Sequence, residues 1–311
     1  MSSMDKPDHS KFYMAGCGGM LGDAFYKEFS NQYKLKCTDI DVNEEWLSYL
    51  DFRDFEAYQK DVHEFFPDYL FHLGAYTDLE YCEQNPEGTY ETNTKSVEHA
   101  VAIANELSIP LLYISTAGIF DGKKDVYDES DAPNPMGHYA RSKYLAEEYV
   151  QENSRNHLIC RAGWMMGGGP RKDKKFIQKL MSQLKNGEKE LHIVHDKLGT
   201  PTYTIDFARN VKLLIKEGKT GLYNMVCQGA TSRLEVAREL ISQLEMNGNV
   251  RINEVSSDHF KKEYFAPRPA SERLINARLE QEGLDIMRDW KTSLREYLRE
   301  FYSDDIRNVE K

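Results

Sequence analysis

The stretch Lys11–Gln32, KFYMAGCGGMLGDAFYKEFSNQ, decides the fold of this 311-residue chain. It begins as a short apolar strand, turns through several glycines and continues with helical spacing, so it predicts a strand-to-helix junction. Glycine is needed at such a junction for a tight turn, for a close approach of the backbone to a pyrophosphate and for close helix–strand packing. The junction therefore predicts a dinucleotide site. Its expected cofactor-binding residues are Gly16, Gly19, Met20, Leu21 and Gly22.

A second strand is expected at Tyr33–Thr38, and it ends in Asp39-Ile40-Asp41. A carboxylate at this position accepts hydrogen bonds from the adenosine ribose and repels a 2′-phosphate, so Asp39 or Asp41 favours NAD(H), with NADP(H) less expected. Asp51 and Phe52 are expected beside the adenine, where Asp51 would accept a hydrogen bond from the amino group. A plain surface loop is the alternative interpretation of these two residues.

Strands and helices then alternate along the chain. Apolar runs predict strands, helical spacing predicts the segments between them, and the alternation is typical of an α/β, doubly wound (Rossmann-like) parallel sheet. Its ligand crevice is expected at the carboxyl ends of the strands, where Gly74 and Ala75 would contact the cofactor and Thr77 the substrate. The predicted elements are a helix at 55–66, a strand at 69–75, a polar segment at 77–93, a helix at 94–107 and strands at 111–116 and 157–162.

Two segments predict a proton-transfer site at this edge: LLYISTAGIF (111–120) and GHYARSKYLAEEY (137–149). The first is a buried strand that ends at Thr116. In the second, Tyr139 and Lys143 lie four residues apart and share one helical face. The Lys143 ammonium is expected to lower the pKa of the Tyr139 phenol. Taken alone, the Y-x-x-x-K spacing is common on amphipathic helices.

Composition narrows the classes of partner. The net charge of −11, from 40 Lys and Arg against 51 Asp and Glu, argues against a nucleic-acid surface. No apolar run approaches the roughly 20 residues of a membrane span, so no membrane partner is expected. The five scattered cysteines form no C-x-x-C pair, which indicates reduced thiols in a cytoplasmic protein and no metal site. Residues 1–10 lack the apolar segment of a secretory signal and are interpreted as a disordered leader.

Beyond Gly163 the alternation loosens. A glycine-rich exit, a basic helix at 172–185, a strand at 191–194, a helix at 205–217, a strand at 222–226 and further helices predict a smaller, discontinuous substrate-binding lobe. The dinucleotide-binding domain is expected to comprise residues 11–165 and 199–226. The lobe would comprise residues 166–198 and 227–311. A cleft between two such lobes is a common place for a small molecule to bind.

Together these segments resemble the extended short-chain dehydrogenase/reductases, and among them the dTDP-4-dehydrorhamnose reductase family. The resemblance covers nearly the whole chain from Lys11. It rests on motifs in the same order and spacing: GCGGMLG (16–22), STAGIFDG (115–122), YDESDAPNP (127–135), YARSKYLAEE (139–148), RAGWMMG (161–167), DKLGTPTY (196–203) and RPASERLINARL (268–279).

The resemblance implies NADH-dependent reduction of the 4-keto group of a nucleotide-linked 4-keto-6-deoxyhexose. Thr116, Tyr139 and Lys143 would be the catalytic trio, and Lys143 would also bond the nicotinamide ribose. Asn93 would lie beside the cofactor. On the nucleotide-sugar side, Trp164 would form an apolar wall and Arg268 would bind a phosphate. A homodimer is a further expectation.

Two departures from the family pattern bear on the substrate. Ala117-Gly118 follow Thr116 where the family usually has Asp-Tyr, and Lys197 stands where it tends to have Gln. We expect a wider, less polar pocket at Ala117-Gly118; close backbone packing is the alternative. Two other functions remain open, a regulatory subunit resembling the β subunit of methionine adenosyltransferase and a sugar-nucleotide epimerase. An epimerase would use the same trio with a tightly held NAD.

Overall fold

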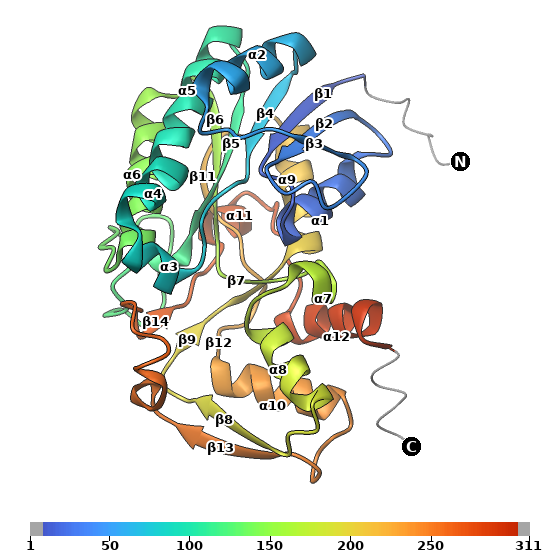
Figure 1. Cartoon of the computed structure of the whole chain (residues 1–311), viewed down its shortest axis with the longest axis vertical. Coiled ribbons are helices and arrows are strands. Elements are labelled where there is room, and N and C mark those ends of the chain that lie inside the picture. Colours follow the sequence, from blue (N-terminus) through green and yellow to red (C-terminus); the bar gives the residue numbers. More distant parts are fainter. Residues whose placement is uncertain (1–8, 304–311) are drawn as a thin grey trace.

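A seven-stranded sheet forms the larger part of the computed structural model, which describes residues 9–303 (Figure 1). Every pairing in it is parallel, and the strand order β11-β6-β5-β4-β1-β2-β3 reverses direction about β1 and β4. This confirms the doubly wound α/β fold. The strands are β1 (Lys11–Ala15), β2 (Lys34–Asp39), β3 (Leu47–Tyr49), β4 (Tyr69–His72), β5 (Leu111–Thr116), β6 (His157–Ala162) and β11 (Gly221–Asn224).

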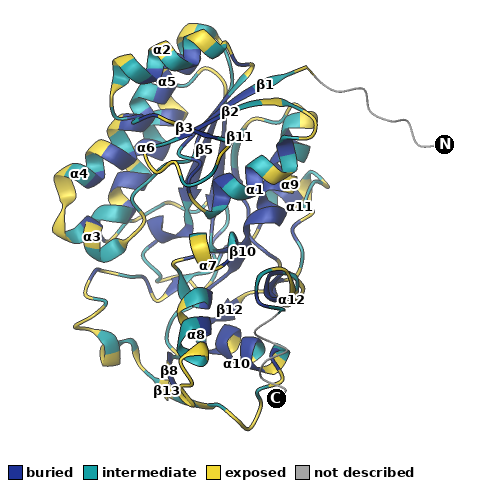
Figure 2. Cartoon of the chain, turned by 45° about the vertical axis from the view of Figure 1, so that its right-hand side comes forward, coloured by how far each residue is buried: buried dark blue, intermediate teal, exposed yellow. Residues whose placement is uncertain are grey.

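Helices cover both faces of this sheet because successive strand residues point to opposite sides. In β1, Tyr13 packs with α2 (Phe55–Phe65), α5 (Ser96–Leu107) and α6 (His138–Asn153). Phe12 and Met14 pack with α1 (Met20–Phe29) and α9 (Thr204–Lys216) on the other face. Figure 1 shows the two helical layers on either side of the strands, and Figure 2 shows that the strands between them are buried.

The polar segment 77–93 forms helices that the sequence analysis did not predict. They are α3 (Leu79–Gln84), α4 (Pro86–Tyr90) and the π-helix η1 (Glu91–Lys95), which leads into α5. Local signals explain them. The Asp78 side chain caps α3 by accepting from the Tyr81 N–H, and Pro86 occupies the first turn of α4.

Most of the remaining elements form a smaller lobe below the carboxyl ends of the strands, whereas η2 and α11 pack against the sheet domain (Figure 1). The predicted helix at 172–185 is divided into α7 (Gly169–Lys172) and α8 (Phe176–Lys185), and β8 (Glu190–Val194) pairs with the unpredicted strand β13 (Arg251–Val255). The other elements are β7 (Trp164–Met166), β9 (Leu198–Gly199), β10 (Pro201–Tyr203), β12 (Thr231–Ser232), β14 (Ser271–Glu272), the 3-10 helices η2 (Ala117–Ile119) and η3 (Ser257–Phe260), α10 (Arg233–Gln243), α11 (Ala277–Gln281) and α12 (Trp290–Phe301).

Three compositional expectations can be compared with the structure. All five cysteines are buried free thiols. Within residues 9–303, no group of three or more His, Cys, Asp and Glu side chains is placed to hold a metal ion. Over the same residues, no helix combines the length and apolarity of a membrane span. The first eight residues of the expected leader lie outside the described range.

Candidate active site

The glycine turn between β1 and α1 leaves room for a ligand only on its outer side. A Cβ on Gly16, whose φ is +81°, would lie 2.2 Å from the backbone nitrogen of Gly74, and one on Gly22 would lie 2.2 Å from the Cys17 carbonyl oxygen. At Gly19 a Cβ would meet no atom within 4 Å. Gly19 is also the N-cap of α1 and provides no side-chain cap, so no capping side chain occupies the first N–H groups of the helix. Met20 and Leu21 form the first turn of this helix. This cradle fits the pyrophosphate of a dinucleotide.

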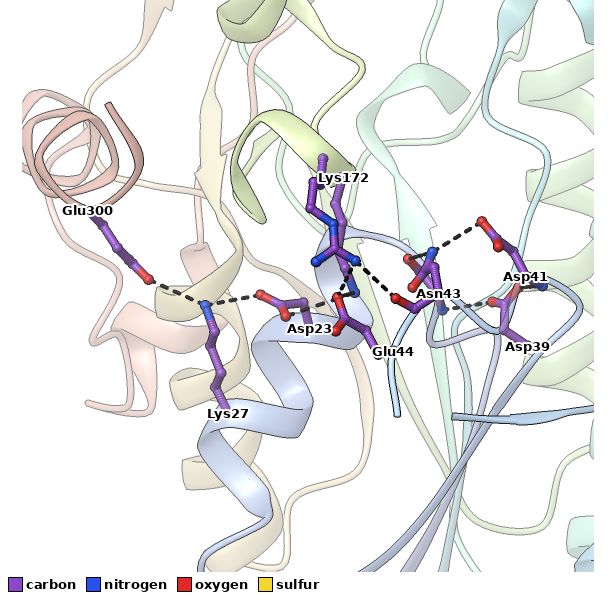
Figure 3. Close-up of polar contacts among 10 residues, drawn as sticks. Asp23, Lys27, Asp39, Asp41, Asn43, Glu44, Lys172 and Glu300 are labelled. Atoms are coloured by element: carbon purple, nitrogen blue, oxygen red, sulfur yellow. Dashed lines mark hydrogen bonds and ion pairs between the residues drawn. The ribbon is translucent and has the colours of Figure 1, made fainter. Parts of the chain in front are cut away.

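Asp39 ends β2 beside this turn. Its carboxylate accepts hydrogen bonds from the backbone N–H groups of Gly18 (2.8 Å) and Asp41 (2.9 Å). Asn43 ties the loop to the turn by donating to the Gly18 carbonyl (3.2 Å) and the Asp41 carboxylate (3.1 Å). Figure 3 shows Asp39, Asp41 and Asn43 together after the strand. The predicted position of the ribose-binding carboxylate is therefore rigid and anionic.

The cations near this loop are already paired with carboxylates. The Lys172 ammonium, from α7, lies 3.3 Å from Glu44 Oε1 and 3.9 Å from Asp23 Oδ1. Arg171 also reaches Glu44 Oε1, at 3.1 Å. Lys27 lies between Asp23 and Glu300 (Figure 3). These contacts join the smaller lobe to the glycine-turn side of the sheet.

Asp51 and Phe52 are held by neighbouring residues. Arg53 binds both carboxylate oxygens of Asp51, at 2.8 Å and 2.6 Å, and lowers the pKa of Asp51. The Phe52 ring is buried so close to Gly74 that a Cβ there would meet it at 2.2 Å. Gly74 is thus fixed by both Phe52 and the glycine turn, and Ala75 follows it at the edge of the sheet.

Asn93 is fully buried in η1, and its amide is used inside the protein. Its Oδ1 accepts from the Tyr76 N–H (2.7 Å), and its Nδ2 donates to the Tyr76 carbonyl (3.0 Å) and to Ser142 Oγ (3.1 Å). Asn93 therefore fixes the chain beyond β4 against the helix that carries Tyr139 and Lys143.

Thr116 and Tyr139 meet where β5 ends. The Thr116 hydroxyl accepts from the Gly118 N–H (3.1 Å), and Tyr139 lies in the first turn of α6. Burial raises the pKa of the Tyr139 phenol to about 12, while a hydrogen bond with Thr116 acts in the opposite direction. The expected lowering of this pKa by Lys143 is wrong, because burial raises it and the one opposing contact comes from Thr116 and not from Lys143. The phenol is consequently protonated at neutral pH and able to donate.

Lys143 lies one helical turn further into the protein and is only 5% exposed. Its ammonium lies 4.3 Å from the centre of the Tyr113 ring on β5. Burial lowers the pKa of Lys143 to about 7, and the nearby Glu147 carboxylate partly opposes this shift. Glu147 itself is paired with Arg161 at 2.5 Å in the core.

Trp164 begins β7, the short strand that follows β6 in the chain. Its indole Nε1 donates to Glu272 Oε2 (2.8 Å), and the Arg233 guanidinium lies 3.7 Å from the ring centre. The ring crosses Gly199 so closely that a Cβ there would lie 2.2 Å from it. Burial lowers the pKa of Arg233 to about 10, so the guanidinium stays protonated at neutral pH. The indole is thus enclosed by charged groups rather than forming a purely apolar wall.

Arg268 and Thr77, the other residues predicted to bind substrate, are each held by a partner. Arg268 forms a two-pronged ion pair with Glu80 of α3, at 2.6 Å and 2.8 Å. The carbonyl and hydroxyl oxygens of Thr77 accept hydrogen bonds from the Lys175 ammonium, at 2.9 Å and 3.0 Å. Both contacts cross between the sheet and the smaller lobe.

The two departures from the family pattern have structural explanations. Lys197 donates to the carbonyl oxygens of Arg268 (3.2 Å) and Pro269 (3.3 Å), so it supports the backbone at Arg268. Ala117 is buried in an apolar cluster, and a Cβ on Gly118 would lie 3.3 Å from Glu272 Oε1. A carboxylate thus borders the space that Gly118 leaves. The wider, less polar pocket expected in comparison with the family stays a prediction.

Four charged residues at the predicted cleft were not expected from the sequence: Glu80, Lys175, Arg233 and Glu272. Glu272 lies within the motif RPASERLINARL (268–279), and its charge in this motif was the one feature that could have marked it as a candidate site residue. The other three carried no local signal, since their partners lie far away in the chain. The Arg233 guanidinium, for example, lies over the indole of Trp164, which is 69 residues earlier in the chain. Helix and strand spacing cannot connect residues so far apart.

Comparison with known proteins gives consistent matches over this whole architecture. The family model described as "RmlD substrate binding domain" matches residues 10–303. The crystal structure of dTDP-4-dehydrorhamnose reductase from Yersinia enterocolitica is 31% identical with a TM-score of 0.83, covering 93% of this chain and 98% of that one. The Bacillus anthracis dTDP-4-dehydrorhamnose reductase in complex with NADP is 26% identical with a TM-score of 0.85, covering 94% and 100%. The curated Escherichia coli dTDP-4-dehydrorhamnose reductase is 27% identical over 268 residues, covering 81% of this chain and 86% of that protein.

Proposed function

The chain belongs to the RmlD substrate binding domain family, and from this premise we propose that it is an oxidoreductase that reduces the 4-keto group of a nucleotide-linked 4-keto-6-deoxyhexose. The observation that carries the proposal is the meeting of Thr116 and Tyr139 at the end of β5, with Lys143 one helical turn behind Tyr139. The same edge of the sheet carries the glycine cradle. The names of the similar reductases support the same reaction.

In this proposal the phenol of Tyr139 is the general acid. Its raised pKa keeps the proton in place until the carbonyl oxygen gains negative charge, and the proton then moves from the phenol to that oxygen. Thr116 donates a hydrogen bond to the same oxygen and holds the carbonyl beside Tyr139. A nicotinamide dinucleotide supplies the hydride when it is bound. The Lys143 ammonium would bond its ribose and stabilise the phenolate that remains after proton transfer.

The glycine cradle and Asp39 would hold the dinucleotide, and we propose a preference for NADH. Support comes from Asp39, whose carboxylate is fixed by two backbone N–H groups where a 2′-phosphate would bring further negative charge. Lys172 and Arg171 are bound to Glu44, so neither is free to neutralise that phosphate in this arrangement. The similar Bacillus anthracis structure contains NADP, which makes the preference a property to be measured for this chain.

The experiment is to supply the purified protein with dTDP-4-dehydrorhamnose and NADH or NADPH, and to follow nicotinamide absorbance and the product. Reduction that requires added reduced cofactor and disappears in Tyr139→Phe supports the proposal. Interconversion of a 4-hydroxy sugar nucleotide and its C4 epimer by protein with tightly bound NAD, with no added reductant, would instead indicate an epimerase. Binding of the dinucleotide without turnover on any 4-keto sugar nucleotide would favour a regulatory subunit.

A further inference from the structure

Glu272 is a carboxylate at the predicted cleft, and the family resemblance assigned it no role. Strand β14 places it opposite Gly199 of β9, between the catalytic edge and Trp164. Its Oε2 accepts the indole hydrogen bond from Trp164 at 2.8 Å. Its Oε1 receives no hydrogen bond or ion pair from any residue in the range 9–303. One oxygen is thus engaged and the other is available.

The available oxygen borders the place where the reaction is proposed to occur. A Cβ added to Gly118 would lie 3.3 Å from Glu272 Oε1 and 3.5 Å from Thr116 Oγ1, so the two oxygens flank the same small space. The charge of Glu272 also contributes to the raised pKa of Tyr139. Glu272 Oε1 therefore lies beside Thr116, and its charge acts on Tyr139.

Holding Trp164 in place does not account for a carboxylate here. The tryptophan backbone is fixed by its N–H bond to the Thr200 carbonyl (2.9 Å) and by pairing of β7 with β10. Its ring is packed between Gly199 and the Arg233 guanidinium. A neutral side chain with one acceptor would complete these contacts. The negative charge of Glu272 also stabilises the buried Arg233 guanidinium, although the two side chains form no ion pair within 4 Å. Oε1 is not among the buried oxygens that lack a partner in residues 9–303, so it is open to a donor from outside the protein.

We propose that Glu272 Oε1 accepts a hydrogen bond from the hydroxyl group on the ring carbon adjacent to the carbonyl that is reduced, and so selects sugars that carry this hydroxyl. This inference rests on the proposed function, because it identifies a substrate hydroxyl that the proposed active site recognises. In a 4-keto-6-deoxyhexose, the ring neighbours of C4 are C3, which bears a hydroxyl, and C5, which bears a methyl group. The C3 hydroxyl is therefore the donor adjacent to the carbonyl held by Thr116.

The test compares dTDP-4-dehydrorhamnose with its 3-deoxy analogue in the full-length protein. Glu272→Gln keeps an oxygen for the Trp164 indole and removes the anionic acceptor. We expect kcat/KM to fall about 10- to 100-fold for the parent sugar, the range of a hydrogen bond to a charged group, and less than about threefold for the 3-deoxy analogue. Glu263→Gln, at an exposed position of the same lobe, is the matched control and should change neither value.

A second variant leaves Glu272 in place and displaces its carboxylate. Gly118→Ala puts a methyl group about 3.3 Å from Oε1. It should therefore also lower kcat/KM for the parent sugar more than for the 3-deoxy analogue, but by a smaller factor than Glu272→Gln. Equal losses on both sugars in Glu272→Gln and Gly118→Ala would overturn the inference and leave Glu272 a support for Trp164. If the unmodified protein reduces both sugars equally well, Glu272 does not read the hydroxyl, although the proposed reaction stands. If it reduces neither, the proposed function fails and takes this inference with it.

Discussion

The proposed cofactor edge and the predicted sugar cleft lie at the same end of the sheet, but they are built from different groups. The cofactor edge is built mainly from backbone: three glycines and the first turn of α1, with one carboxylate that two backbone N–H groups hold in place. The cleft consists of charged side chains that bind one another or the protein, as in Arg268 with Glu80. The cofactor edge is thus preformed, whereas a sugar nucleotide that binds Arg268 has to replace an existing ion pair.

Tyr139→Phe gives the largest expected effect and separates the two regions most clearly. The change removes the proton donor and keeps the ring, so turnover should fall by about 10²- to 10⁴-fold, the usual value of general acid catalysis. NADH affinity should stay nearly the same, because the glycine cradle is untouched. Steady-state turnover and a fluorescence titration with NADH measure the two quantities. Near-normal turnover would contradict the mechanism and revive the regulatory-subunit interpretation.

Lys143, at the boundary of the two regions, should make stability depend on pH. Its folded-state pKa is lowered to about 7 from 10.5, so the unfolded chain binds the extra proton between these values. The penalty for burying the cation is fully present below about pH 7 and disappears as the pH rises toward 10.5. Lys143→Met should therefore raise the free energy of unfolding at pH 6.5 by a few kcal/mol, on the scale of 1.4 kcal/mol per pKa unit, and by much less at pH 10.

Denaturant unfolding of the unliganded protein at the two pH values measures this difference. Lys216→Met, on the exposed end of α9, is the control and should show no such pH dependence. A stabilisation of Lys143→Met that is equal at both pH values would show that packing, rather than the buried charge, is responsible.

The Asp39 carboxylate should set the choice of dinucleotide. Asp39→Ser removes the negative charge at the predicted ribose site, so the ratio of NADPH to NADH dissociation constants should fall about tenfold, equivalent to about 1.4 kcal/mol. Titration with both cofactors measures the ratio. Asp41→Ser is the matched control, since its side chain carries the same charge two residues further along the loop. A larger effect at Asp41 would transfer the role to that residue.

The two regions also differ in how far the sequence predicts them. Strands β5 and β6 match their predicted bounds because apolar residues fill both faces of a central parallel strand. The glycine turn is predictable because its motif is short and local, although Gly16 is also required by the approach of Gly74, which follows β4 in the chain. Once these strands are identified, the parallel topology alone predicts that the carboxyl ends of β1 and β5 share one edge.

The cleft was less predictable because its contacts join residues far apart in the chain. Trp164 meets Glu272, and Arg268 meets Glu80, across more than one hundred residues in each case. The break in the predicted helix at 172–185 has a similar origin. Asp173 accepts hydrogen bonds from the Lys175 N–H (2.7 Å) and the Tyr297 hydroxyl (2.9 Å), and the second donor comes from the last helix. Helical spacing carries no information about such a partner.

The smallest expected effect concerns the ion pair that covers Arg268. If a phosphate of the substrate binds this guanidinium, it competes with Glu80, and Glu80→Gln should lower KM for the sugar nucleotide. The side chains are 27% and 21% exposed, so solvent screens the pair and its removal should improve KM by only about two- to fivefold. The gain should shrink as salt is added, because salt weakens the competing pair in the unmodified protein. Glu87→Gln, exposed on α4, is the matched control and should leave KM unchanged. A higher KM in Glu80→Gln would mean that the carboxylate holds Arg268 in its binding position, and the cleft would then be preformed like the cofactor edge.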